Sequence, residues 1–189
     1  MNDSLFSLRG KRAVVVGGAG EIGLSISEAL LEFGAKVTII DIKNATNPKY
    51  ATWKEKGLDY HLVNSDVTNR NEVKKSMDKA RVLLQGPIDI LVNSAGIQRR
   101  NSSELFSIKD WDEIIAVNLN AVFIYSQEAI KDMLESGAGK IINIASIMSQ
   151  FGGITIPAYS ASKGGVAQLT KAMSNDLASR GICINAIAP

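Results

Sequence analysis

The sequence of 189 residues predicts an α/β fold in which helices cover both faces of a doubly wound parallel sheet. Short continuous apolar runs recur along the chain, and such runs are typical of strands buried on both faces. Segments with helical periodicity separate them, and this alternation gives parallel strands joined by helical crossovers. One domain over residues 1–189 is the simplest division, and it is long enough to bury a core.

Six strands are expected, over residues 13–16, 36–41, 60–67, 88–92, 140–145 and 181–187. Helices are expected over residues 22–33, 72–84, 110–136 and 157–180. In the first helix the apolar side chains recur on one face, which contains Ile22, Ile26, Ala29, Leu30 and Phe33. Residues 44–57 are polar and contain a proline, so we expect a loop with at most a short helix. Residues 151–153 are expected to form a flexible link.

A glycine-rich turn follows the first strand and opens the first helix. Glycines let backbone N–H groups approach a pyrophosphate, and the amino end of a helix adds positive potential. An acid at the end of the second strand can accept hydrogen bonds from both ribose hydroxyls and would repel a 2′-phosphate. We therefore expect a site for NAD, in preference to NADP, that contains Gly17, Gly20, Glu21, Ile22, Gly23 and Asp41. The alternative is a glycine-rich turn without a ligand.

Polar or small residues also follow the third and fourth strands, at the carboxyl ends where open α/β sheets bind ligands. Asp66 and Val67 either border an adenine or form an ordinary cap between strand and helix. Asn93, Ala95 and Gly96 lie where small side chains would let a cofactor approach the strand end.

Arg99 and Arg100 stand in the next loop, where a guanidinium could clamp a carboxylate or a polyhydroxylated substrate. The alternative for each arginine is an exposed surface charge. Asn118 lies inside a predicted helix although asparagine has poor helix propensity. It therefore either serves a site or kinks the helix.

Tyr159 and Lys163 are four residues apart and share one face of the last predicted helix. An ammonium group beside a phenol stabilises the phenolate, and such a phenol can exchange a proton with an alcohol or carbonyl oxygen. Ser146 stands at the end of the fifth strand, thirteen residues before the tyrosine. The spacing alone is weak evidence, because chance can supply it.

Composition excludes several classes of protein. The single Cys183 allows no internal disulfide framework and no multi-cysteine zinc site, so we expect no metal. Cys183 itself is expected to be a small buried side chain in a strand. The net charge of +2 is spread without basic blocks, so no nucleic acid partner is expected. No apolar run could cross a bilayer, and residues 1–4 do not begin a signal peptide, so we expect a cytoplasmic protein without a membrane partner.

Together these motifs resemble the short-chain dehydrogenase/reductase family over residues 8–189. The resemblance rests on the glycine turn, residues 93–96, Asn118, Ser146 and the pair of Tyr159 and Lys163, and it implies a Rossmann-type fold. Two residues depart from the usual turn: Val16 replaces a threonine, and Glu21 occupies the place of the middle glycine.

Details around the site are similar to the members of the family that act on gluconate derivatives. The resemblance implies an NAD-dependent oxidoreductase that transfers hydride between nicotinamide and a secondary alcohol or ketone of a sugar acid. Tyr159 would be the general acid/base, Lys163 would hold the nicotinamide ribose, and Ser146 would orient the substrate oxygen. Asn118 would hold a water that relays protons, and Arg99 would contact the substrate.

The resemblance also implies a homodimer or homotetramer. Family members continue beyond the position of Pro189 into a substrate loop, a helix and a seventh strand. A catalytically silent nucleotide-binding fragment is therefore the alternative function. A serine hydrolase built on Ser146 is disfavoured, because His61 is the single histidine and no nucleophile-elbow motif surrounds the serine.

Overall fold

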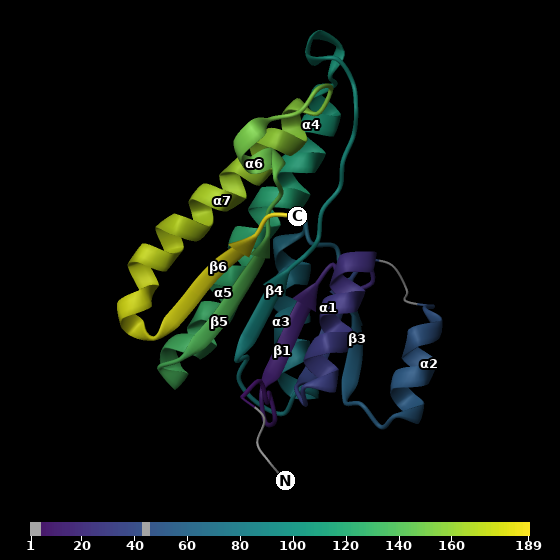
Figure 1. Cartoon of the computed structure of the whole chain (residues 1–189), viewed down its shortest axis with the longest axis vertical. Helices are drawn as coiled ribbons and strands as arrows, with labels where there is room; N and C mark the ends of the chain where they lie inside the picture. Colours follow the sequence, from purple (N-terminus) through teal and green to yellow (C-terminus); the bar gives the residue numbers. More distant parts are fainter. Residues whose placement is uncertain (1–4, 43–45) are drawn as a thin grey trace.

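The computed structural model describes residues 5–42 and 46–189, and within them it confirms a doubly wound parallel sheet. The strand order is β3-β2-β1-β4-β5-β6, with β3 and β6 at opposite edges (Figure 1). All five neighbouring pairs are parallel. The bounds are β1 Arg12–Val16, β2 Lys36–Asp41, β3 Tyr60–Asn64, β4 Ile90–Asn93, β5 Gly139–Ile144 and β6 Ile182–Ile187.

Helices connect these strands and cover the sheet on both faces (Figure 1). They are α1 Glu21–Glu32, α2 Pro48–Glu55, α3 Arg70–Leu83, α4 Ile108–Ile115, α5 Ala121–Ser136, α6 Met148–Phe151 and α7 Pro157–Leu177. A π-helical turn, Ala116–Asn120, joins α4 to α5, and short 3-10 turns span Ser103–Leu105 and Ala178–Arg180. Thus the predicted helix over residues 110–136 is interrupted, and the predicted link over 151–153 begins inside α6.

The core is divided into two main layers by the sheet, because successive side chains of a strand point to opposite faces. Val14 and Val16 of β1 belong to the layer beneath α3, α5 and the end of α7. Ala13 and Val15 belong to the layer beneath α1 and α2. Both layers are apolar, so the middle strands are buried on both sides, as their continuous apolar runs predict.

The strand order reverses between β1 and β4, and this places the ends of both strands side by side. Val16 pairs in register with Asn93, and the N–H of Ser94 donates to the carbonyl of Val16 at 2.8 Å. The turn after β1 and the segment after β4 therefore meet at the carboxyl edge of the sheet. Ligand sites of doubly wound sheets lie at such a reversal.

The rotation of α1 differs from the apolar pattern of its sequence. Ile22 and Phe33 are 48% and 47% exposed, whereas Gly23, Leu24 and Ser27 face the interior. A Cβ atom on Gly23 would lie 2.3 Å from the carbonyl oxygen of Gly17. The helix thus turns Gly23 to the glycine turn, because no side chain fits in that contact.

The prediction of a buried Cys183 is wrong, because β6 is an edge strand within the described residues. Ile182 and Ile184 are buried on the face covered by α7, while Cys183 on the other face is exposed. Its sulfur accepts a hydrogen bond from Nζ of Lys140 at 2.9 Å.

Some expectations fall at or beyond the limits of the described chain. Residues 1–4, and residues 44 and 45 of the expected loop over 44–57, lie outside the described residues. The rest of that loop contains α2, a short helix capped by the side chain of Asn47. No helix of residues 5–42 or 46–189 is long and apolar enough to cross a membrane, and these residues include no cluster of three or more potential metal-ligating side chains.

Candidate active site

The glycine turn between β1 and α1 contains two glycines that the fold requires. Gly17 has φ +74°, and a Cβ atom there would lie 2.4 Å from the backbone nitrogen of Ala95. Gly23 is excluded from carrying a side chain by its contact with the Gly17 carbonyl. A Cβ on Gly20 would meet no heavy atom closer than 3.5 Å. Gly20 is therefore less crowded than Gly17 and Gly23, and a ligand could approach the backbone there.

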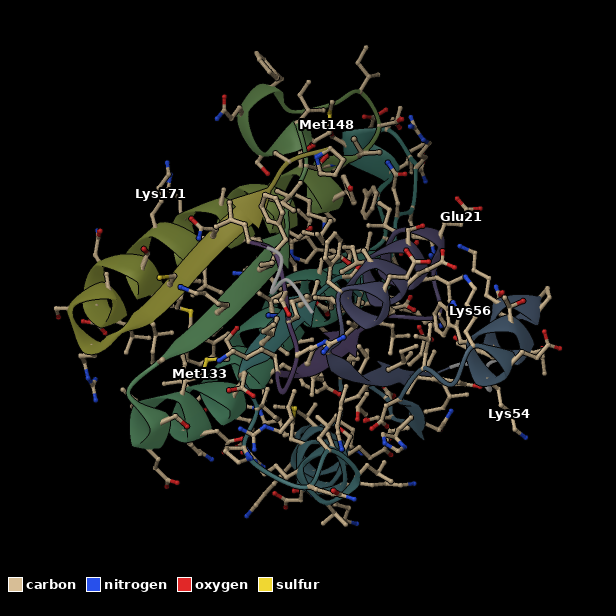
Figure 2. The ribbon with its side chains drawn as sticks, turned by 60° about the horizontal axis from the view of Figure 1, so that its bottom comes forward. Glu21, Lys54, Lys56, Met133, Met148 and Lys171 are labelled. Atoms are coloured by element: carbon tan, nitrogen blue, oxygen red, sulfur yellow. The ribbon has the colours of Figure 1, made fainter. Side chains whose placement is uncertain are left out.

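Gly20 is also the N-cap residue of α1, with extended backbone and no side-chain cap. The first N–H groups of a helix lack partners within the helix and attract anions. Glu21 follows in the first turn and is exposed, and Figure 2 shows it at the outer end of α1. The carboxylate can therefore point into solvent instead of filling the space at Gly20. Ile22 beside it is half exposed.

Asp41 lies at the end of β2, directly beside the glycine turn. Its Oδ2 accepts a hydrogen bond from the backbone N–H of Ala19 at 3.0 Å. The side chain is half-buried. The structure thus brings the predicted ribose-binding acid to the predicted phosphate-binding turn.

Asp66 and Val67 have structural roles that the sequence left open. Oδ1 of Asp66 accepts hydrogen bonds from N–H and Oγ1 of Thr68, at 2.9 and 2.7 Å, so the carboxylate stabilises the turn before α3. Asn69 caps that helix. Val67 packs in the core layer beneath α3. A contact of either residue with adenine stays a prediction.

The side chain of Asn93 lies in the interior, with 3% of the residue exposed. Its Nδ2 donates to Oγ of Ser126 at 3.1 Å and to Oδ1 of Asn143 at 2.9 Å. Asn143 in turn donates to Thr170 of α7 at 2.9 Å. This buried network of hydrogen bonds joins β4 and β5 to α5 and α7. The side chain of Asn93 therefore stabilises the carboxyl ends of these strands from the protein interior.

Lys163 and Tyr159 are brought together as their spacing predicts. Nζ of Lys163 lies 5.7 Å from the centroid of the Tyr159 ring, and it donates to the carbonyl of Ile144 at 2.6 Å. Lys163 is 4% exposed, whereas Tyr159 is half-buried and can reach a ligand. A Cβ atom on Gly96 would lie 3.7 Å from the lysine amine. The segment after β4 therefore borders the same amine.

Asn118 lies where the predicted helix is interrupted, and its side chain has structural hydrogen bonds. It lies in the π-helical turn between α4 and α5 and is fully buried. Its Oδ1 accepts from the N–H of Ile97 at 2.8 Å, and its Nδ2 donates to the carbonyl of Ile97 and to Oγ of Ser162, at 2.9 and 3.1 Å. The side chain thus fixes the loop after β4 to α7; a water held by Asn118 stays a prediction.

Ser146 follows β5 and is 7% exposed. Its Oγ accepts from the N–H of Met148 at 3.2 Å, and its own N–H donates to Oγ of Ser149 at 3.3 Å. The sequence reasoning missed Ser149 and also Ser162, whose hydroxyl donates to the carbonyl of Tyr159 at 2.7 Å. Their position beside motif residues was the available signal, but serine is too common for that signal to stand out.

Arg99 is paired with acids of α4. Its guanidinium lies 4.0 Å from Asp110 and 3.5 Å from Glu113. Arg100 is exposed and forms no hydrogen bond or ion pair with the described part of the chain. Arg99 is thus paired at the surface, and Arg100 has the freer cation. A contact of Arg99 with the substrate stays a prediction.

His61, the partner that a serine hydrolase would need, lies in β3 at the far edge of the sheet from β5. Its Nε2 is 3.1 Å from Oδ1 of Asp59. It does not join Ser146, so the structure gives no support to a hydrolase.

The fold and this site define a class: a doubly wound α/β protein with a glycine turn and a tyrosine–lysine pair at one edge of its sheet. Comparison with known families identifies the class, because residues 11–189 match the short chain dehydrogenase family. The chain belongs to this family.

The chain is similar to several enzymes with related names. It is 41% identical to 5-keto-D-gluconate 5-reductase of Escherichia coli (strain K12), covering 100% of this chain and 74% of that protein. It is also 41% identical to gluconate 5-dehydrogenase of Gluconobacter oxydans (strain 621H), covering 98% and 72%. The crystal structure of a gluconate 5-dehydrogenase from Burkholderia cenocepacia J2315, in complex with NADP and tartrate, superposes with TM-score 0.90 and 38% identity over 97% of this chain and 72% of that chain.

Replacing Lys163 with Met should stabilise the fold near pH 7, by about 1–3 kcal/mol, because the folded state would no longer hold a buried ammonium. Burial lowers the pKa of Lys163 from 10.5 to about 8. Between these values the unfolded chain binds more protons than the folded chain, so wild-type stability should rise with pH and the advantage of Lys163→Met should shrink. Urea unfolding across this pH range measures both effects.

Lys171→Met provides the matched control, since Lys171 is an exposed lysine of the same helix that projects outward in Figure 2. It should leave the pH dependence unchanged. An advantage of Lys163→Met that is constant with pH would contradict the assignment.

Proposed function

We propose that this protein is an NAD-dependent oxidoreductase that interconverts a secondary alcohol and a ketone of a sugar acid. The observation that carries the proposal is the buried amine of Lys163 beside the accessible Tyr159. Both lie at the carboxyl ends of the strands, where a ligand could approach the glycine turn at Gly20. Family membership supports the reaction class, and the names of the relatives support the substrate class.

The residues at the edge fit a dinucleotide. Space at Gly20 and the amino end of α1 suit a pyrophosphate, and Asp41 suits an adenosine ribose. Gly96 is exposed and adjoins the lysine amine, so a nicotinamide ribose could approach the chain there. Bound nicotinamide supplies or accepts the hydride. The preference for NAD follows from the charge of Asp41, which would repel a 2′-phosphate. The Burkholderia enzyme was crystallised with NADP and does not support this preference.

Tyr159 is the proposed general acid and base. In the reduction its O–H donates a proton to the substrate carbonyl oxygen, and in the oxidation its oxygen accepts the proton of the alcohol. The half-buried phenol is within reach of a ligand, whereas the amine is not exposed. Lys163, with a pKa of about 8, can release and recover a proton near neutral pH. Ser146 would donate a hydrogen bond to the same substrate oxygen.

Arg100 is the better candidate for the carboxylate of a sugar acid. Arg99 is already paired with two carboxylates of α4, whereas Arg100 has no such partner within the described chain. A guanidinium binds a carboxylate through two parallel hydrogen bonds, which fixes the orientation of an acidic substrate.

The second candidate function is nucleotide binding without turnover. Calorimetric titration with NAD, followed by turnover assays on keto-gluconates and on neutral ketones, separates the two. Binding without turnover on any of them would favour the silent function. Equal rates on acidic and neutral ketones would remove the sugar-acid specificity but keep the oxidoreductase.

Tyr159→Phe should lower kcat by at least about a hundredfold, because it removes the hydroxyl that exchanges the proton. The affinity for NAD should stay within a few-fold of wild type, since the ring and the lysine remain. Steady-state kinetics and calorimetry measure the two quantities. Retained turnover would show that another group is the acid and base.

Asp41→Ala should reduce the preference for NAD over NADP by about tenfold or more, because it removes the charge that repels a 2′-phosphate. Asp41→Asn is the matched control, since an amide oxygen can still accept from Ala19 and support the turn. Both variants should shift the ratio of kcat/KM for the two cofactors. An unchanged ratio would place the ribose elsewhere.

Arg100→Ala should raise KM for an acidic substrate by about tenfold or more and leave KM for a neutral ketone unchanged. Arg99→Ala should have the smaller effect, because the Arg99 charge is already paired. The reverse order in the two variants would assign the substrate carboxylate to Arg99.

A further inference from the structure

The hydroxyl of Ser149 connects the two halves of the candidate site. Its Oγ accepts a hydrogen bond from the N–H of Ser146, at 3.3 Å, and donates to the carbonyl of Lys163, at 2.8 Å. Ser146 lies just after β5, and Lys163 belongs to the second turn of α7. A single hydroxyl thus joins the residue proposed to orient the substrate to the helix that carries the proposed acid and base.

The bond from Ser146 to Ser149 satisfies a buried donor. Ser146 is 7% exposed, and among the described residues the Ser149 hydroxyl is the acceptor of its N–H. A buried N–H without an acceptor is unfavourable, so loss of this hydroxyl would favour displacement of the Ser146 backbone. Close packing supports the same contact: a Cβ atom on Gly164 would lie 3.6 Å from the carbonyl oxygen of Ser149.

The opposite side of α7 is held by a different set of contacts. Asn118 donates to Oγ of Ser162, which donates to the carbonyl of Tyr159. Leu119 of the same π-helical turn packs against Gly165, where a Cβ atom would lie 2.9 Å from a leucine methyl. The turn of α7 that carries the reactive pair is therefore fixed from both sides, and only Ser149 ties it to Ser146 by a side-chain hydrogen bond in the described chain.

We propose that Ser149 is a positioning residue that sets the place of Ser146 relative to Tyr159 and Lys163. This inference rests on the proposed function, since it gives Ser146 and the pair a common substrate oxygen. The hydroxyl touches neither substrate nor cofactor; it acts through the backbone of Ser146. A displacement of Ser146 would weaken its hydrogen bond to the substrate oxygen in the transition state. The same displacement would affect substrate binding less.

Ser149→Ala should therefore lower kcat by about tenfold or more, with KM and the affinity for NAD within a few-fold of wild type. Ser149→Thr keeps a hydroxyl and should restore most of the lost kcat. Ser160→Ala is the matched control: Ser160 adjoins Tyr159, but its Oγ has no hydrogen-bond partner in the described chain, so kcat should not change. An unchanged kcat in Ser149→Ala, or an equal loss in Ser149→Thr, would overturn the proposal.

A second measurement does not depend on turnover. Amide hydrogen exchange, followed by NMR, should be about tenfold or more faster at Ser146 in Ser149→Ala than in wild type, while Ser149→Thr should retain protection. Unchanged protection of this amide in Ser149→Ala would overturn the proposal. If the wild-type protein turns over no alcohol or ketone, the proposed function fails, and the exchange at Ser146 still decides whether Ser149 holds that backbone.

Discussion

The burial of one amine is the constraint on which the candidate site depends. The side chain of Lys163 would be well solvated in water, yet it is buried at the carboxyl end of the sheet. There its Nζ donates a hydrogen bond to the carbonyl of Ile144. Because burial disfavours the ammonium, this position has to be maintained by packing elsewhere. The π-helical turn and α6 supply that packing on opposite sides of α7. A buried ionisable group whose pKa is shifted in this way is typical of functional sites.

The other half of the edge depends on backbone geometry. Gly17 and Gly23 are required because the segment after β4 and the first turn of α1 both come within contact of the glycine turn. The segment after β4 thus lies against the glycine turn at Ala95 and beside Lys163 at Gly96. A cofactor that spans this edge would therefore meet backbone groups at one end and the lysine at the other. The register of β1 and β4 helps to set the distance between the glycine turn and Lys163.

The sequence predicts the parts of this architecture that follow from local patterns. The six strands and the pair of Tyr159 and Lys163 were recoverable because continuous apolar runs and helical spacing are local signals. The rotation of α1 about its axis could not be predicted, because a backbone contact at Gly23 outweighs the apolar face of the helix. The exposure of Cys183 depends on which strand forms the edge, and the pairing of Arg99 depends on where α4 lies. Such features arise from tertiary neighbours that the local sequence does not specify.

The departures of the glycine turn from the family pattern have a physical explanation. The steric requirement falls on Gly17, Gly18 and Gly23, and neither departure changes these residues. Val16 is a core residue of β1, so an apolar side chain suits it. Glu21 is exposed in the first turn of α1, where the helix dipole favours a carboxylate. The same dipole would favour a pyrophosphate. A pyrophosphate at this helix end would therefore compete with Glu21, unless Glu21 turned its carboxylate into solvent.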